Sequence, residues 1–269
     1  MIIDVRFQTV KIGLVSDIHN GPDQETRVGT RAIELLKGFV DEMNNIFKPD
    51  FIVELGDRVN NVDHNTDYSH MKQVKNFLKG LRMPIYHILG NHDIASLGKE
   101  ENKDIMETNY NYKSFDYGDC HFILLDAQDE TIGGIGGSMS EKQLNWLKND
   151  LEQTSKKTII FSHQALDEQD ITDNIHFRDY PTYAFVSNRE EVRKIIENSK
   201  KVIAIFSGHV HWNNMEIINK IPYFSIHSLV ETWTTNGEVC GDYAKAYLHP
   251  NGVIEVNVLG KDPINYTYP

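Results

Sequence analysis

Short apolar runs alternate along the chain with segments whose apolar residues recur at helical spacing. The runs have the length expected of strands covered on both faces, and they are 10–16, 51–55, 85–89, 158–161 and 202–207. The helical segments lie between them, at 31–47, 71–81, 141–151 and 190–196. This alternation predicts parallel strands joined by crossover helices, which is the organisation of an α/β fold.

The remaining segments lack a helical period. Two short runs, 113–117 and 121–126, are separated by a Gly-Asp pair and predict a hairpin. The segment 215–259 predicts further strands, and we interpret it as a second sheet. The segments 94–111 and 165–188 show no regular period, so we expect irregular excursions that pass over the surface near a site and determine its specificity.

No repeat, low-complexity tract or linker divides the chain, so we expect a single domain over residues 1–269. The stretch Met1–Arg6 contains an acid and no apolar run long enough for a signal peptide or a membrane span, which favours a cytoplasmic protein that binds no membrane. Cys120 and Cys240 lie far apart and lack Cys-x-x-Cys spacing. We therefore expect both thiols to be reduced and structural.

The charge balance narrows the range of partners. Against 39 acidic residues stand 27 basic ones, which gives a formal net charge of -12. Such a chain is poorly suited to holding nucleic-acid phosphates by bulk electrostatics. We therefore expect no long nucleic acid among its partners, and the same charge balance disfavours a nuclease that acts on long DNA.

The five predicted strands all end in polar side chains that can bind metals. These residues are Asp17 and His19; Asp57; Asn91, followed by His92 and Asp93; His163; and His209 with His211. Parallel strands would bring their ends to one edge of a sheet. Carboxylates, an amide and imidazoles without a thiolate suit divalent Mn, Fe, Zn or Mg, and their number exceeds what one ion needs. The sequence therefore predicts two divalent ions.

Three of these residues invite specific roles. Asp57 is the lone carboxylate at its strand end and is the best candidate to bridge two ions. His92 follows a proposed ligand and could donate a proton to a leaving oxygen. Asp93 adjoins His92 and could hold it in one tautomer, although adjacency in sequence does not establish contact.

Taken in order, these residues resemble the calcineurin-like metallophosphoesterase superfamily, whose pattern is D-x-H, GD, GNH[DE], a lone H and GHxH. The resemblance implies a four-layer α/β/β/α sandwich with two central mixed sheets. It also implies a dinuclear centre, in which Mn or Fe is favoured, and a catalytic role for His92. One ion would be held by Asp17, His19, Asp57 and His211, and the other by Asp57, Asn91, His163 and His209.

Within that superfamily, the runs 51–57 and 143–147 look most like the cyclic-nucleotide phosphodiesterase and ADP-ribose pyrophosphatase branches. Purple acid phosphatases carry a tyrosine three residues after the GD aspartate, whereas this chain has Asn60. Arg58 either contacts a substrate phosphate or pairs with a surface acid. Six further residues could contribute to the site. His64, His70 and His176 could overhang it from loops, and Tyr180, Tyr183 and Trp212 could stack on a base. Structural roles are the more common outcome for such residues.

The sequence thus predicts a metal-dependent hydrolase of phosphoester bonds, with a phosphodiester or pyrophosphate of a nucleotide as the preferred substrate. A metal-bridging hydroxide would attack phosphorus while His92 assists the leaving group. A broad phosphomonoesterase is the alternative, because nothing in the sequence limits how many phosphate oxygens the site accepts. A non-catalytic scaffold of the same fold is less favoured, since every ligand position holds a competent side chain. The sequence leaves the native metals and the oligomeric state open.

Overall fold

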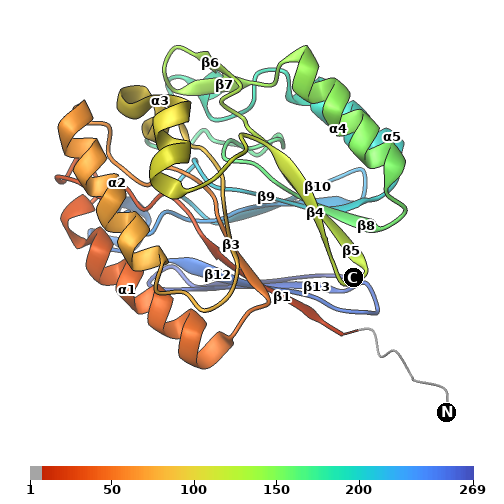
Figure 1. The fold of residues 1–269 in the computed structure, drawn as a ribbon, viewed down its shortest axis with the longest axis horizontal. Coiled ribbons are helices and arrows are strands. Elements are labelled where there is room, and N and C mark those ends of the chain that lie inside the picture. The colour runs from red at the N-terminus through yellow and green to blue at the C-terminus, as the bar shows by residue number, and fades with distance from the viewer. Residues whose placement is uncertain (1–7) are drawn as a thin grey trace.

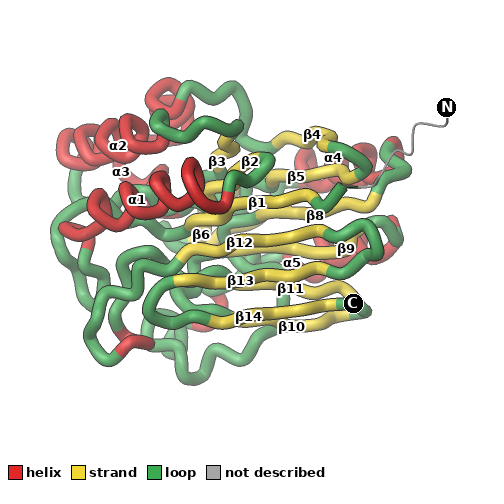
Figure 2. The backbone as a smooth tube through the Cα atoms, turned by 90° about the horizontal axis from the view of Figure 1, so that it is seen from below, coloured by secondary structure: helices red, strands yellow, loops and turns green. Residues whose placement is uncertain are grey.

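The computed structural model describes residues 8–269, so the interpretation of Met1–Arg6 lies outside the described residues. Two six-stranded mixed sheets lie face to face (Figure 1). The first has the order β14-β13-β12-β1-β2-β3, and the second β10-β11-β9-β8-β5-β4. Figure 2 shows the strands of both sheets running in nearly the same direction. This is the aligned packing that twisted sheets adopt when they bury one face against each other.

The bounds of the elements are as follows. The first sheet contains β1 (Val10–Val15), β2 (Phe51–Glu54), β3 (Ile85–His87), β12 (Tyr243–Leu248), β13 (Ile254–Leu259) and β14 (Ile264–Tyr268). The second contains β4 (Lys113–Tyr117), β5 (Cys120–Leu124), β8 (Lys157–Phe161), β9 (Val202–Ser207), β10 (Asn214–Ile218) and β11 (Ile221–Ser225). A small hairpin joins β6 (Glu130–Ile132) to β7 (Gly136–Ser138). The main helices are α1 (Ala32–Glu42), α2 (His64–Leu78), α3 (Asn91–Met106), α4 (Glu141–Gln153) and α5 (Arg189–Ser199).

Three apolar layers hold the sandwich together. Between the sheets, Leu14 and Phe51 of the first sheet share a buried cluster with Phe161 of the second. The helices α1, α2 and α3 add a layer on the outer face of the first sheet, and α4 and α5 add one on the outer face of the second (Figure 1). The four-layer α/β/β/α arrangement expected from the resemblance is therefore confirmed.

The structure corrects the expectation of an irregular segment over 94–111, because α3 occupies Asn91–Met106. Its helical period was hard to detect for two reasons. Leu97 and Met106 are its only large buried apolar side chains, and the helix is broken at Gly98, whose φ of 72° lies in the left-handed region. Similarly, α2 begins seven residues before the predicted start at Met71, because its first turns are polar and are capped by the Asp63 side chain.

The interpretation of 215–259 as a second sheet is correct for β10 and β11 but wrong for the strands that follow. The strand β12 pairs antiparallel with β1, so β12, β13 and β14 complete the first sheet. Alternating burial along β12 and β13 is consistent with strands that cover the core with one face only. Among residues 8–269, no helix combines the length and apolarity that crossing a membrane requires.

One buried polar contact ties the β4–β5 hairpin to α4. His121 Nδ1 lies 2.7 Å from Asp116 Oδ1, and Nε2 lies 2.7 Å from Asp150 Oδ2. Hydrogen bonding to Asp150 raises the pKa of His121 above its ordinary 6.5, against the opposing effect of burial. Because the folded pKa is raised, the protonated histidine stabilises the fold fully below pH 6.5, and this contribution is lost as pH rises through the raised pKa.

We therefore expect His121→Gln to lower the free energy of unfolding more at about pH 6 than at about pH 9, as measured by urea unfolding of both proteins at each pH. The matched control is His64→Gln, since His64 pairs with Glu101 on the surface, where its side chain is 56% exposed and solvent screens the pair. An equal loss at both pH values would contradict the role of the His121 charge.

Candidate metal centre

The predicted ligands meet where the strand ends of the two sheets come together. One group contains Asp17 and His19 after β1 together with His211 after β9, and its ligand atoms lie within 4.8 Å of one another. The second group contains Asp57, His163 and His209 at the same mutual spacing. His19 Nε2 lies 3.8 Å from Asp57 Oδ2, which connects the two groups. All six side chains are buried.

Asn91 completes the set. It is the first residue of α3, and its Oδ1 lies 3.3 Å from His163 Nε2. The structure therefore brings together all seven side chains that the sequence nominated as metal ligands. Five chain segments supply them, and none of the seven is exposed.

The backbone at these positions is strained in a consistent way. Five of the ligand residues have φ between 45° and 68°, in the left-handed region that side chains other than glycine rarely adopt; they are Asp17, His19, Asp57, His209 and His211. Such conformations cost roughly 1–3 kcal/mol each and persist only where the surroundings enforce them, which is typical of functional sites.

Two glycines allow the segments to approach closely. A Cβ at Gly90 would lie 2.1 Å from Asp57 Oδ1, and one at Gly208 would lie 1.8 Å from Ser16 Oγ. Neither contact is sterically possible. The glycines of the GNH and GHxH motifs are therefore required for packing the ligand segments together.

Hydrogen bonds on the far side of each ring fix which histidine nitrogen faces the centre. His163 Nδ1 lies 2.8 Å from the Leu55 carbonyl oxygen and His209 Nε2 2.9 Å from that of Tyr183, so these nitrogens donate outward. The opposite nitrogens, His163 Nε2 and His209 Nδ1, lie 3.2 Å apart. Their lone pairs converge on one point, as metal ligands oriented by outer hydrogen bonds do.

The first ligand group shows the same arrangement. His211 Nδ1 donates to Glu231 Oε2 over 2.8 Å, which leaves its Nε2 only 3.1 Å from His19 Nε2 and 3.2 Å from Asp17 Oδ1. That Asp17 oxygen is buried and has no hydrogen-bond partner among the described residues. An unpartnered buried carboxylate oxygen facing two imidazole nitrogens suits a cation.

The electrostatics of the site support this fit. Burial by itself would raise the pKa of Asp17, but His211 and His163 hold it below its ordinary range. Burial would lower the pKa of His211, but Asp17 and Glu231 raise it to about 9. A divalent cation would displace such protons, because imidazole coordinates metals only in its neutral form.

The expectation that Asp93 orients His92 is not supported. Its carboxylate instead accepts hydrogen bonds from the backbone N–H groups of Gly90 (3.0 Å), Asp57 (3.0 Å) and Arg58 (2.7 Å), and from the Arg58 guanidinium (2.8 Å). Asp93 therefore positions the loop that carries Asp57. The neighbouring His92 is held through its backbone, whose N–H donates to Asp57 Oδ1 over 2.8 Å.

Neither alternative for Arg58 fits its position, because its side chain is buried and pairs with buried acids rather than with an acid on the surface. Its guanidinium lies 2.6 Å from Glu54 Oε2 and 2.8 Å from Asp93 Oδ2, and it donates to the Ile88 carbonyl oxygen. Both acids are themselves fully buried. Arg58 thus connects β2, β3 and the first turn of α3 behind the ligands.

The His92 ring lies in the site. Its centroid is 4.8 Å from that of His19, and Nε2 lies 3.3 Å from Arg27 Nη1. Burial lowers the pKa of His92, the Asp57 carboxylate opposes that effect, and the Arg27 charge adds to it. With Asp57 and His19, His92 forms a third close group of polar side chains.

Sequence reasoning missed Glu231 and Arg27, and it gave too little weight to His176. Glu231 is buried and hydrogen-bonds both His211 and His176, and Arg27 is buried beside His92. None of the three belongs to a strand-end motif. The sequence offered one signal, and it concerns Glu231: this acid directly follows the apolar pair Leu229-Val230, in a segment that is buried in the structure.

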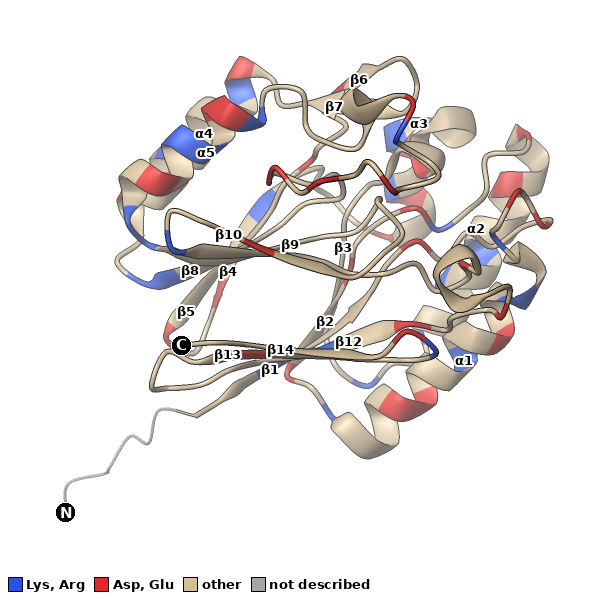
Figure 3. Cartoon of the chain, turned by 180° about the vertical axis from the view of Figure 1, so that it is seen from behind, with Lys and Arg blue, Asp and Glu red and all other residues tan. Residues whose placement is uncertain are grey.

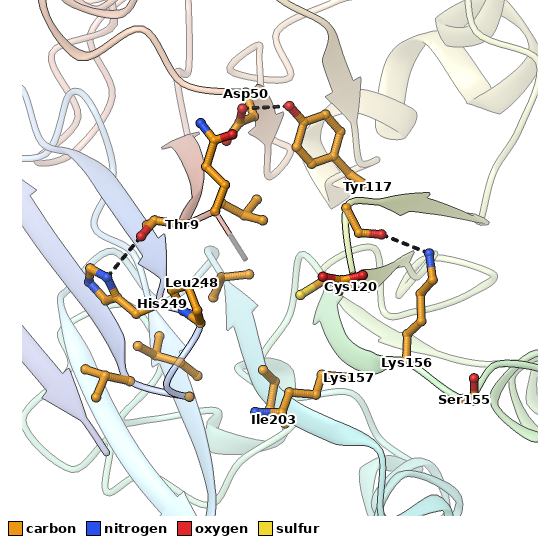
Figure 4. A pocket seen from close by; sticks show the side chains of 18 residues that line it. Thr9, Asp50, Tyr117, Cys120, Ser155, Lys156, Lys157, Ile203, Leu248 and His249 are labelled. Atoms are coloured by element: carbon orange, nitrogen blue, oxygen red, sulfur yellow. Dashed lines mark hydrogen bonds between the residues drawn. The ribbon is translucent and has the colours of Figure 1, made fainter. Parts of the chain in front are cut away.

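The pocket in Figure 4 lies elsewhere. This cavity of about 760 Å³ is lined by the starts of β1, β8 and β9 and by the β12–β13 turn. Lys157 lines it from the start of β8, and His249 from the turn. Those are the strand ends opposite the ligands. The cavity therefore contributes nothing to the candidate metal centre.

The sandwich fold and the two adjoining ligand groups are those of a dinuclear metal hydrolase. The chain belongs to the calcineurin-like phosphoesterase family, whose model matches residues 10–213. It is a hydrolase of phosphoester bonds, and the family implies a centre of two divalent metal ions.

Several known proteins are similar to this chain. A human manganese-dependent ADP-ribose/CDP-alcohol diphosphatase is 22% identical over 273 residues, covering 78% of this chain and 76% of that protein. A probable glycerophosphodiester phosphodiesterase of Arcobacter nitrofigilis is 30% identical, covering 65% of this chain and 61% of the other. A dimetal phosphatase from Danio rerio has the same fold, with a TM-score of 0.75, 16% identity and coverage of 97% of this chain and 99% of its own.

We expect Arg58→Met to destabilise the fold by about 3 kcal/mol or more, because it leaves two buried carboxylates without their cation. The variant should also bind Mn²⁺ more weakly, since the Asp57 loop loses its anchor. Urea unfolding and calorimetric Mn²⁺ titration measure the two effects, and Arg58→Lys serves if the methionine variant does not fold.

The matched control is Arg31→Met, because Arg31 pairs with Glu34 on the surface with its side chain 47% exposed. That variant should keep both stability and Mn²⁺ affinity. If a folded Arg58 variant bound Mn²⁺ as tightly as the unmodified protein, the positioning role would be wrong.

Proposed function

We propose that this protein hydrolyses a phosphodiester or pyrophosphate bond in a small nucleotide-type molecule, with Mn²⁺ or iron as the favoured metals. The observation that carries the proposal is the pair of buried ligand groups that meet at Asp57, with His92 beside them. These two groups would hold two neighbouring ions, and such a pair of ions would promote in-line displacement at phosphorus. The names of the human diphosphatase and of a probable cyclic nucleotide phosphodiesterase from Fibrobacter succinogenes, which is 26% identical, support a nucleotide substrate.

The proposed ligand assignment follows the two groups and makes Asp57 the shared ligand. Asp17, His19 and His211 would hold one ion, and Asn91, His163 and His209 the other. The close facing of His19 to His211 and of His163 to His209 supports this division. The manganese dependence named for the human relative supports Mn²⁺ as the first metal to test.

When bound, the two ions acidify the attacking water and stabilise charge on the phosphoryl oxygens. The chain's own residues supply the proton for the leaving group and the buried surroundings of the site. His92 presents a ring nitrogen at the edge of the site and can give a proton to the departing oxygen. The hydrogen bond from the His92 backbone N–H to Asp57 positions the His92 backbone relative to the candidate ligands. Burial of the ligands excludes water, which strengthens every charge interaction in the site.

The charge distribution supports a small substrate. In the view of Figure 3, Lys and Arg are interspersed with Asp and Glu over helices and loops. The net charge is -12. This excess of acidic residues disfavours a polynucleotide, which is held through many contacts of Lys and Arg to its phosphates.

The assay that tests this proposal compares two model substrates after metal stripping and reconstitution with Mn²⁺. We expect faster turnover of bis-p-nitrophenyl phosphate, a diester, than of p-nitrophenyl phosphate, a monoester, and no turnover before metal is added. A preference for the monoester would instead support a broad phosphomonoesterase, and no turnover of either would support a scaffold.

Two substitutions separate metal binding from proton transfer. Asp57→Asn should lose metal and activity together, because it removes the shared carboxylate. His92→Ala should keep the metal, as measured by elemental analysis, but lower kcat by about 10²–10⁴-fold. His249→Ala, in the cavity at the opposite strand ends, is the control and should change neither quantity. An active Asp57→Asn enzyme would contradict the bridging role.

A further inference from the structure

Arg27 lies in the loop between β1 and α1, and that loop is fixed by the backbone. Gln24 and Arg27 exchange two backbone hydrogen bonds of 3.0 and 2.8 Å. The next residue, Val28, donates to the Val230 carbonyl oxygen, and Thr232 Oγ1 donates to that of Thr26. The position of Arg27 therefore does not depend on a bound ligand.

The guanidinium of Arg27 is buried without a close counter-ion. The residue is 9% exposed. Among residues 8–269, the one carboxylate within 4 Å is that of Glu25, at 3.8 Å, and its side chain is 70% exposed. The remaining contacts of the Arg27 guanidinium are long, at 3.3 Å to Gln24 Oε1 and 3.3 Å to His92 Nε2. The Arg27 Nε atom has no partner among the described residues.

Arg58, by contrast, is a buried arginine whose charge is paired in the same protein, with two carboxylates at 2.6 and 2.8 Å. Burying an arginine without such partners is costly. Arg27 therefore has donors to offer a ligand, and a guanidinium matches phosphate oxygens better than any other side chain does.

The position of Arg27 indicates which phosphate it would bind. Its Nη1 lies 3.3 Å from His92 Nε2, so Arg27 borders the ring that is proposed to assist the departing oxygen. The same His92 ring also lies close to two of the candidate metal ligands, His19 and Asp57. A phosphoryl group attacked at the metal centre would thus have its leaving group next to Arg27.

We propose that Arg27 binds a second phosphate, located in the leaving group, and that the substrates are therefore nucleotides with a pyrophosphate linkage. This inference rests on the proposed function and narrows it. In the reaction, water forms a new P–O bond at the attacked phosphorus, and the P–O bond to the bridging oxygen breaks. That oxygen leaves with the second phosphate, takes the electron pair and receives a proton from His92, while Arg27 stabilises the negative charge on the other oxygens of the leaving phosphate. The products are two phosphate monoesters, and the proton lost by the attacking water restores that of His92.

The proposal separates substrates by their leaving groups. A leaving phosphate carries charge on several oxygens, which a guanidinium can bind through two hydrogen bonds. The nitrophenolate released from bis-p-nitrophenyl phosphate has no such group. Removing Arg27 should therefore harm hydrolysis of a pyrophosphate far more than hydrolysis of that simple diester.

The experiment measures kcat/KM of the Mn²⁺-loaded protein for ADP-ribose and for bis-p-nitrophenyl phosphate. We expect Arg27→Ala to lower the value for ADP-ribose by about 10²-fold, as loss of one donor to developing charge does elsewhere, and that for the diester by less than about tenfold. Arg27→Lys, which keeps the charge but loses the two-pronged geometry, should fall between. Arg31→Ala, a surface arginine of the same loop paired with Glu34, should change neither value.

Binding provides a readout that does not depend on turnover. By calorimetry, Arg27→Ala should weaken binding of α,β-methylene-ADP, which has two linked phosphoryl groups, and leave that of AMP unchanged. A merely structural role for Arg27 would weaken both ligands together.

Three results would overturn the inference in distinguishable ways. Equal losses on both substrates would place Arg27 on the attacked phosphoryl group and leave the proposed function intact. Turnover of the diester without turnover of ADP-ribose would exclude pyrophosphates and leave a phosphodiesterase. Absence of turnover on both substrates, with the metal bound, would remove the proposed function together with this inference.

Discussion

The ligand site depends on one buried carboxylate, that of Asp93, which joins the β2–α2 loop to the start of α3. It accepts hydrogen bonds from three backbone N–H groups and from Arg58, so all its oxygens are engaged in holding the chain. Burial raises the pKa of Asp93 to about 6, and the Arg58 charge opposes that shift. The carboxylate and the guanidinium therefore need each other, because either alone would be a buried and uncompensated charge.

This pair also explains how the site tolerates strain. Asp57 adopts a left-handed conformation with φ of 57°, and the hydrogen bond from its own N–H to Asp93 holds it there. The corresponding support for Asp17 comes from His209, whose N–H donates to Asp17 Oδ2 over 2.9 Å. Each ligand segment is thus held by a neighbouring segment from elsewhere in the chain. Because the holding groups are buried and specific, they fix the backbone of the segments that carry the candidate ligands.

The strand ends could be predicted from sequence because two simple regularities coincide there. Apolar runs mark buried strands, and polar residues that follow them must lie at the strand ends; this located the seven candidate ligands and His92, which the structure brings together. The features that could not be predicted from sequence were missed for physical reasons as well. The sheet to which β12 belongs depends on pairing with β1, more than 200 residues earlier, which no local pattern records. The role of Asp93 depends on which groups its oxygens face, and the sequence showed only that His92 is adjacent.

Arg27 and Glu231 lay beyond sequence reasoning for a further reason, which also bears on how an acidic protein could bind the anion proposed as its substrate. Both come from irregular loops, and their significance arises from burial, which sequence does not reveal outside periodic elements. At physiological ionic strength the charges of exposed side chains are screened within about 8 Å. The net charge of -12 therefore says little about the interior of the site. There, a guanidinium that is 9% exposed acts over short distances in a medium with little water, where its attraction for an anion is strongest. In the proposed function, attraction of that kind would select small phosphates able to enter, whereas the acidic exterior would disfavour long polyanions that must lie along it.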